Sequence, residues 1–157
     1  MNVEITLADL QAALVATGNT GITIKSQDNG NTSYIGGRWR GTLNSLDVAL
    51  MYRVKVTEAC EITLEGMPVD PAEHPVTIPG NGSKWIAFPI GESMTVTNAF
   101  AGFAVNGDEL KSQSDGSTKY TGGRWRGTLG TLDPGKGHIY KSASSADRVL
   151  TFPSSAK

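Results

Sequence analysis

The chain is poor in the residues on which most catalytic and metal sites depend. It has one cysteine, Cys60, and two histidines, His74 and His138, among 157 residues. One cysteine excludes an intramolecular disulfide framework, and a cysteine nucleophile would need a histidine partner that no motif supplies. No cysteine or carboxylate stands at metal-ligand spacing from either histidine. We therefore expect no enzyme activity, no metal and no cofactor, and we expect Cys60 to be a small buried residue.

Long apolar runs and a strong net charge are missing as well. No apolar run approaches the length of a membrane span and no signal peptide is present, so we expect no membrane insertion. The formal net charge of -1 provides no general basic field for a nucleic-acid backbone, and we expect no nucleic-acid partner. The 38% hydrophobic residues and 19 glycines indicate a folded, β-rich chain with many turns.

What the chain does contain is a ten-residue phrase that occurs twice. Residues 34–43 read YIGGRWRGTL, and residues 120–129 read YTGGRWRGTL. Around the phrase, residues 25–27 and 111–113 are both KSQ at the same offset. Further upstream the offset is three residues greater, and Thr6 then aligns with Thr95. An internal duplication of this extent predicts two similar halves.

Each copy is predicted to begin with a short helix and to continue as antiparallel strands. Apolar residues recur at i, i+3 and i+7 after Thr6 and Thr95, which are well placed as N-caps, and Gly18 and Gly107 offer C-terminal stops. The dipeptides 36–37 and 122–123 are both Gly-Gly, which is typical of hairpin turns. The predicted strands are 22–27, 33–35, 38–43, 50–56, 61–64, 84–89, 109–113, 119–121, 124–129, 138–142 and 148–152.

The predicted fold class is α+β. Two pseudo-symmetric repeats, each a short helix packed on a small antiparallel β-sheet, are expected to form one compact β-rich unit and one structural domain. Residues 1–69 are the first repeat and residues 70–157 the second. The opening strand 84–89 has no counterpart in the first repeat. Because repeat units bury their faces against neighbours, we favour excision of the chain from a larger protein with neighbouring domains.

The second copy resembles a tandem repeat of large secreted or cell-surface proteins of Bacteroidetes and related bacteria. That pattern runs WISFP, an Ala/Leu-rich helix, GDxIKSQ, Tyr, WxGxL and PGKGY. The chain reads WIAFP at 85–89, GDELKSQ at 107–113, WRGTL at 125–129 and PGKGH at 134–138. His138 replaces an aromatic residue of the pattern. The resemblance implies an exported, non-catalytic module, extracellular or at the cell surface, often beside adhesive or glycan-degrading domains.

The repeated phrase supplies every candidate ligand-binding residue. Paired aromatic and arginine side chains suggest carbohydrate binding, because a flat ring can stack on a sugar while polar groups bond its hydroxyls. The candidates are Tyr34, Arg38, Trp39 and Arg40 in the first copy and Tyr120, Arg124, Trp125 and Arg126 in the second.

Strand alternation divides these candidates between two faces. Trp39 shares a face with Leu43, whereas Arg38 and Arg40 point the other way. The tryptophans are therefore expected to face the core, as is Trp85 beside its apolar neighbours, and the tyrosines could complete either a core or a site. The arginines form either a solvated strand face or a site for sulfate, carboxylate or uronic-acid groups.

The leading functional prediction is an extracellular, non-catalytic binding module. Its expected ligand is a carbohydrate, either a polysaccharide or a host or cell-surface glycan, in the service of adhesion. The alternative is a structural spacer repeat with no ligand of its own. The duplication predicts that any site should occur twice.

Overall fold

The computed structural model describes residues 5–154, which divide into two compact units. Unit 1 holds the residues up to Asp47 together with Tyr52–Pro68. Unit 2 holds Val48–Met51 and the residues from Val69 onward. The sequence did not indicate that the segment 48–51 joins the second unit. The single compact body expected from the sequence stays a prediction, and each unit is described by itself.

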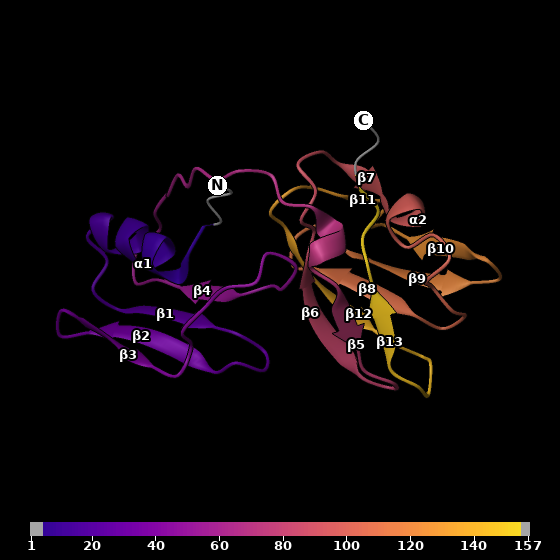
Figure 1. The fold of residues 1–157 in the computed structure, drawn as a ribbon, viewed down its shortest axis with the longest axis horizontal. Coiled ribbons are helices and arrows are strands. Elements are labelled where there is room, and N and C mark those ends of the chain that lie inside the picture. Colours follow the sequence, from indigo (N-terminus) through magenta and orange to yellow (C-terminus); the bar gives the residue numbers. More distant parts are fainter. Residues whose placement is uncertain (1–4, 155–157) are drawn as a thin grey trace. The chain divides into compact units, whose positions relative to one another are not determined.

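The protein is mixed and β-rich, with antiparallel sheets, as the α+β class predicts. Its described residues form the helices α1 (Leu7–Ala16) and α2 (Val96–Ala99) and the 3-10 turn η1 (Pro71–Glu73) (Figure 1). The strands are β1 (Ile22–Lys25), β2 (Asn31–Ile35), β3 (Arg38–Gly41), β4 (Arg53–Lys55), β5 (Val76–Ile78), β6 (Ser83–Ala87), β7 (Met94–Thr95), β8 (Glu109–Ser112), β9 (Ser117–Thr121), β10 (Arg124–Gly127), β11 (Thr131–Leu132), β12 (Gly137–Lys141) and β13 (Arg148–Leu150). None of the described helices is long and apolar enough to cross a membrane.

In unit 1, α1 covers one face of a four-stranded sheet of order β3-β2-β1-β4 (Figure 1). The predicted N-cap at Thr6 is confirmed, and it forms a capping box: the Thr6 hydroxyl accepts a hydrogen bond from the Asp9 N–H, and the Asp9 carboxylate accepts one from the Thr6 N–H. These two bonds satisfy donors that a helix start leaves unpaired. The buried core between helix and sheet consists of Leu7, Leu14, Ile22, Ile24 and Leu43.

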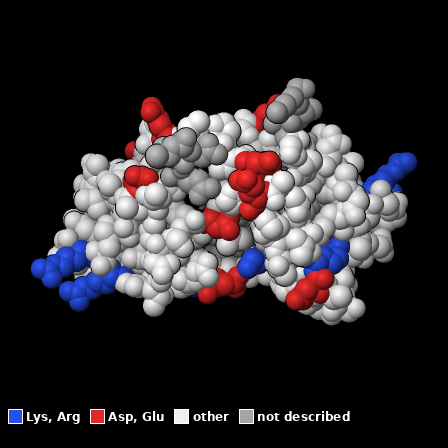
Figure 2. Space-filling view, in the orientation of Figure 1, with Lys and Arg blue, Asp and Glu red and all other residues white. Residues whose placement is uncertain are grey.

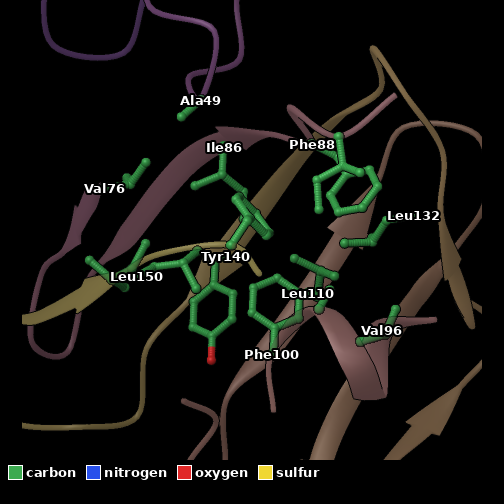
Figure 3. Close-up of a cluster of buried hydrophobic side chains, with 14 of the residues drawn as sticks. Ala49, Val76, Ile86, Phe88, Val96, Phe100, Leu110, Leu132, Tyr140 and Leu150 are labelled. Atoms are coloured by element: carbon green, nitrogen blue, oxygen red, sulfur yellow. The ribbon is translucent and has the colours of Figure 1, made fainter. Parts of the chain in front are cut away.

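Unit 2 is built on a five-stranded sheet of order β10-β9-β8-β12-β6, with the small strand pairs β7–β11 and β5–β13 beside it. The segment 48–51 runs along the free edge of β6, where the Ala87 N–H donates to the Ala49 carbonyl at 2.9 Å. Side chains from β6, β8, β12 and the turn after α2 meet in one core, in which Phe100, Leu110 and Tyr140 are labelled in Figure 3.

The two copies of the phrase form the hairpins β2–β3 and β9–β10. Each hairpin turns on its Gly-Gly pair, with φ of 60° and 78° at the first pair and 60° and 76° at the second. Two successive positive φ values are those of a tight turn that matches the twist of the strands, so the predicted turns are confirmed. In the resulting register, Tyr34 lies opposite Trp39 and Tyr120 opposite Trp125.

The segment after β4 departs from the predicted structure. Residues 61–64 form no strand, because only Ile62 packs on the core of unit 1 and the sheet ends at β4 within the described residues. Cys60 is consequently exposed rather than buried. The prediction that it is a buried core residue is wrong.

The second helix is shorter than its apolar spacing suggested. It stops at Ala99, not near Gly107, because Phe100 leaves helical geometry (φ -112°, ψ 22°) and its ring is buried in the core. The Pro-rich connection contains a strand that the sequence did not indicate, β5, whose three residues pair with β13. Three residues are too few to show an alternating pattern.

Candidate functional site

Strand alternation sorts the repeated phrase as predicted. Trp39 and Trp125 are half-buried and pack against the cores of units 1 and 2, respectively. The arginines beside them, Arg38, Arg40, Arg124 and Arg126, are all exposed. The candidate residues of each unit therefore belong to two faces of one sheet, an inner face with the aromatic pair and an outer face with the arginines.

The outer face of the first sheet collects cations from all of its strands except β2. Arg40 lies opposite Ser33, Ser33 opposite Thr23, and Thr23 opposite Lys55. Residues directly opposite each other in antiparallel strands share a face. Residues two positions along each strand from these also point to this face. The face therefore carries every lysine and arginine of unit 1, all of them exposed: Lys25, Arg38, Arg40, Arg53 and Lys55.

The strands of this basic outer face, β1 to β4, contain no aspartate or glutamate. On the side of the molecule that Figure 2 shows, blue side chains lie beside β2 and β3 and away from α1. At the centre of the face, the hydroxyls of Thr23 and Ser33 lie 3.0 Å apart in a hydrogen bond. The face is thus positive, with two hydroxyls at its centre.

The outer face of the second sheet repeats this arrangement. Four cations have the same register positions as four in unit 1: Lys111, Arg124, Arg126 and Lys141 correspond to Lys25, Arg38, Arg40 and Lys55. A fifth, Lys119, lies 3.2 Å from the carboxylate of Glu109. The hydrogen bond from Lys119 lowers the pKa of Glu109, and nearby lysines contribute further. One carboxylate among five cations leaves the second face positive.

Trp85 also belongs to this outer face and not to the core. It is half-buried, and it points away from the face of β6 to which Ile86 points. Its register partner on β12 is Ile139. Ile139 in turn lies opposite Lys111. The prediction that Trp85 is a core residue is therefore wrong, because it relied on apolar neighbours in sequence, whereas strand alternation turns those neighbours to the other side.

The inner face of unit 1 has an open hollow beside its aromatic pair. The rings of Tyr34 and Trp39 are 5.3 Å apart between centroids and inclined by 46°. Facing these rings is a row of α1 side chains other than the leucines that α1 buries in the core. Together they line a hollow of about 530 Å³ formed by Ala8, Gln11, Ala12, Val15, Ala16, Tyr34 and Trp39.

The inner face of unit 2 is filled where unit 1 is open. The ring of Phe100 lies 5.7 Å from that of Trp125, whose other neighbour, Tyr120, is at 5.3 Å. In the alignment anchored on the two N-caps, Phe100 occupies the position of Gln11. The difference was visible in the sequence, but only the structure shows that this aligned position faces the tryptophan.

Unit 2 contains a buried ionic group that sequence reasoning missed. The carboxylate of Asp108 is fully buried and accepts hydrogen bonds from the Tyr140 hydroxyl at 2.5 Å and the Ala143 N–H at 2.8 Å. Arg148 donates to it at 2.9 Å. Burial by itself raises the pKa of Asp108, but these hydrogen bonds outweigh it and lower the pKa. Because the carboxylate is enclosed, its role is to hold the loops around it in place.

Among the described residues, no group of three or more histidine, cysteine, aspartate or glutamate side chains is arranged to hold a metal ion. His138 is buried, and its Nε2 atom has no hydrogen-bond partner among the described residues. Burial lowers the pKa of this imidazole. It therefore lies within the core rather than at a surface where a ligand could reach it.

No protein-family model matches the chain, and no curated protein or solved structure shows significant similarity to it. Its function must be inferred from the surfaces of the molecule itself. Two kinds of surface stand out: the basic outer faces of both sheets, and the aromatic hollow of unit 1.

Proposed function

We propose that the protein is a non-catalytic binding module that holds an anionic polysaccharide on the outer faces of its sheets. One observation carries this proposal: all lysines and arginines of unit 1 lie on one sheet face whose strands have no carboxylate. The unit is not basic overall, since Asp9, Asp28 and Glu58 are among its acidic residues. Its charges are segregated rather than in excess, as expected of a local site.

The chemistry of the basic outer face suits sulfate or uronic-acid groups. Guanidinium groups bond such anions through two parallel hydrogen bonds, and lysines add point charges. The hydroxyls of Thr23 and Ser33 can exchange hydrogen bonds with sugar hydroxyls. In unit 2, Trp85 adds a ring next to the lysines, on which the apolar side of a sugar can stack.

The recurrence of four cations at the same register positions supports a repeated site. We propose that the two units are pseudo-symmetric copies of one repeat and that each binds its own stretch of polymer. A polymeric ligand that reaches both faces would gain avidity without any new contact. This fits the resemblance to repeats of bacterial surface proteins, from which we propose an extracellular or cell-surface location.

The alternative is a structural spacer without a ligand. It is favoured by the position of Arg53 and Lys55 on the last strand of the first sheet, where charged side chains discourage pairing with other chains. Arg38 and Arg40 lie on β3, the other edge strand, and can have the same role, but Lys25 lies on the inner strand β1, where protecting an edge does not require a cation. We therefore prefer the binding module.

A titration of the full chain with heparin and polygalacturonate, with dextran as the neutral probe, tests the proposal. The double variant Arg38→Ala/Arg40→Ala and its counterpart Arg124→Ala/Arg126→Ala should each weaken binding, and added salt should weaken it further because exposed charges are screened. Lys136→Ala, which removes a partly exposed cation off these faces, should change little. Equal binding of dextran, or no binding of either acidic polymer, would contradict the proposal, and tighter binding of duplex DNA would indicate a nucleic-acid module.

A further inference from the structure

The hollow of unit 1 is the second surface that the fold leaves open, and it lies apart from the basic outer face. Trp39 projects to the inner side of β3, whereas Arg38 and Arg40 project to the outer side. A ligand in the hollow therefore cannot contact those arginines. The hollow requires an explanation of its own.

The walls of the hollow suit a flat apolar ring. One wall is the Tyr34–Trp39 pair, and the other is a stripe of α1 in which three of five side chains are alanine. Residues spaced by three and four along a helix share a face, so these small side chains leave the space in front of the rings empty. The carboxamide of Gln11, the hydroxyl of Tyr34 and the indole N–H of Trp39 are the polar side-chain groups of the lining, and none of them is hydrogen-bonded to a described residue.

Unit 2 shows what fits such a space. There the phenyl ring of Phe100, only 2% exposed, packs on Trp125 from just past the end of α2, at the position that aligns with Gln11 of unit 1. The tyrosine–tryptophan pair is otherwise alike, with centroids 5.3 Å apart in both units. An aromatic side chain carried on a polypeptide is thus the group that this pair accommodates within the same molecule.

We propose that the hollow of unit 1 binds an aromatic side chain, tyrosine or phenylalanine, presented by another polypeptide. Aromatic rings pack well on tryptophan in tilted or edge-on arrangements, and a preformed hollow has little ordering cost on binding. A sugar ring suits it less, because its several hydroxyls would lose water and find only Gln11, Tyr34 and the indole N–H of Trp39 as partners. This site is independent of the polysaccharide faces.

The test is an NMR titration of the full chain with N-acetyl-L-tyrosinamide and N-acetyl-L-phenylalaninamide. The indole N–H signal of Trp39, assigned with Trp39→Phe, should shift in a saturable way, with a Kd of roughly millimolar order for so small a probe. Gln11→Phe, which copies unit 2, should fill the hollow, raise Tm and weaken binding by at least about tenfold. Ala12→Leu should block the hollow by a different route.

Two matched controls accompany these variants. Ala101→Leu, at the aligned exposed position of unit 2, and Arg40→Ala, on the other side of β3, should leave the titration unchanged. Unchanged probe binding by a well-folded Gln11→Phe variant would overturn the proposal. So would the absence of any saturable shift, or a larger shift with methyl glucopyranoside than with the amino-acid amides. Polysaccharide binding should be the same in Gln11→Phe, which separates the two proposals.

Discussion

Asp108 is the residue on which two loops of unit 2, those containing Val105 and Ala143, converge. Its carboxylate receives hydrogen bonds from β12, from the loop after it and from Arg148 at the start of β13. Arg148 also lies over the ring of Phe103, 4.5 Å from its centroid, where a cation is attracted to the face of the ring. A charge enclosed in this way is stable only while every partner is in place.

Asp108→Asn should therefore destabilise the protein strongly. It removes the negative charge but leaves the guanidinium of Arg148 largely buried, and breaking one partner of a buried pair costs about 3–5 kcal/mol. Urea denaturation followed by tryptophan fluorescence measures the loss. Asp115→Asn, in a partly exposed ion pair with Lys136, is the control and should change little. A change as small as that of the control would show that the pair is not stabilising.

His138 should make stability depend on pH. Burial lowers its pKa below the ordinary value, while Asp115, the Lys136 carbonyl and Asp133 raise it less. The unfolded chain therefore takes up a proton near pH 6.5 that the folded chain does not, so the free energy of unfolding falls as pH drops below about 6.5.

His138→Phe should remove this dependence, because phenylalanine does not titrate and suits a buried site. The measurement is Tm between pH 7.5 and 5 for the wild type, for His138→Phe and, as a control, for His74→Phe. The wild type and the control should lose Tm on acidification, and the His138→Phe variant should lose less. Identical slopes in all three would contradict the assignment.

At the scale of elements, both RWRG strands, β3 and β10, end on a glycine that no other residue can replace without a shift of the backbone. A Cβ on Gly127, at φ 155°, would lie 2.2 Å from the Ser117 carbonyl oxygen of the neighbouring strand. Gly41 has the same relation to Asn31, at 2.1 Å. The last residue of each RWRG strand thus lets the two backbones approach closely.

Gly127→Ala should destabilise unit 2 by about 1–3 kcal/mol, since the clash is with rigid backbone and the φ is unfavourable. Gly130→Ala is the matched control. A Cβ there meets nothing within 4 Å, so its effect should stay within about 0.5 kcal/mol. Chemical denaturation of both variants decides the point, and equal stability would show that β9 and β10 can move apart freely.

The edge of the first sheet is the element that differs most between the units. Val54 on β4 is 45% exposed. Tyr140, which has the corresponding register position on β12 in the second sheet, is fully buried. In unit 2, β6 pairs along β12. In unit 1, β4 is the last strand of its sheet among the described residues.

A copy of residues 82–93 fused ahead of Ile5 should therefore pair with β4. The expected results are a higher Tm and slower amide exchange at Val54, because the added strand covers apolar surface and backbone groups. A fusion in which the copied Ile86 is changed to Lys is the control. Unchanged exchange at Val54 in the unmodified fusion would count against the pairing.

For the whole molecule, the pattern of charge predicts two sites of one kind. The chain should bind two short sulfated oligosaccharides, and Arg38→Ala/Arg40→Ala should reduce the number to one without changing the other affinity. Calorimetric stoichiometry at low salt is the measurement, since exposed charges act over about 10 Å at 0.1 M salt. A single site in the unmodified chain would mean that only one face binds.

Much of the local structure was predictable because it depends on neighbours in sequence. Alternation along the RWRG strands separated tryptophans from arginines, since side chains of a strand point to opposite faces whatever surrounds them. The capping box at Thr6 and the Gly-Gly turns followed from the same kind of local geometry. The sequence would also have predicted the basic outer face if the register of β1 and β4 had been known.

What the tertiary structure alone decided depends on contacts between distant residues. The burial of Asp108 arises from Tyr140 and Arg148, and the edge of β6 is covered by residues 48–51, which lie in the other copy in sequence. Trp85 and Cys60 were misplaced for the same reason: apolar character predicts burial only when another element is there to cover it. The sequence thus determined which side chains share a face, and the packing determined which faces are covered.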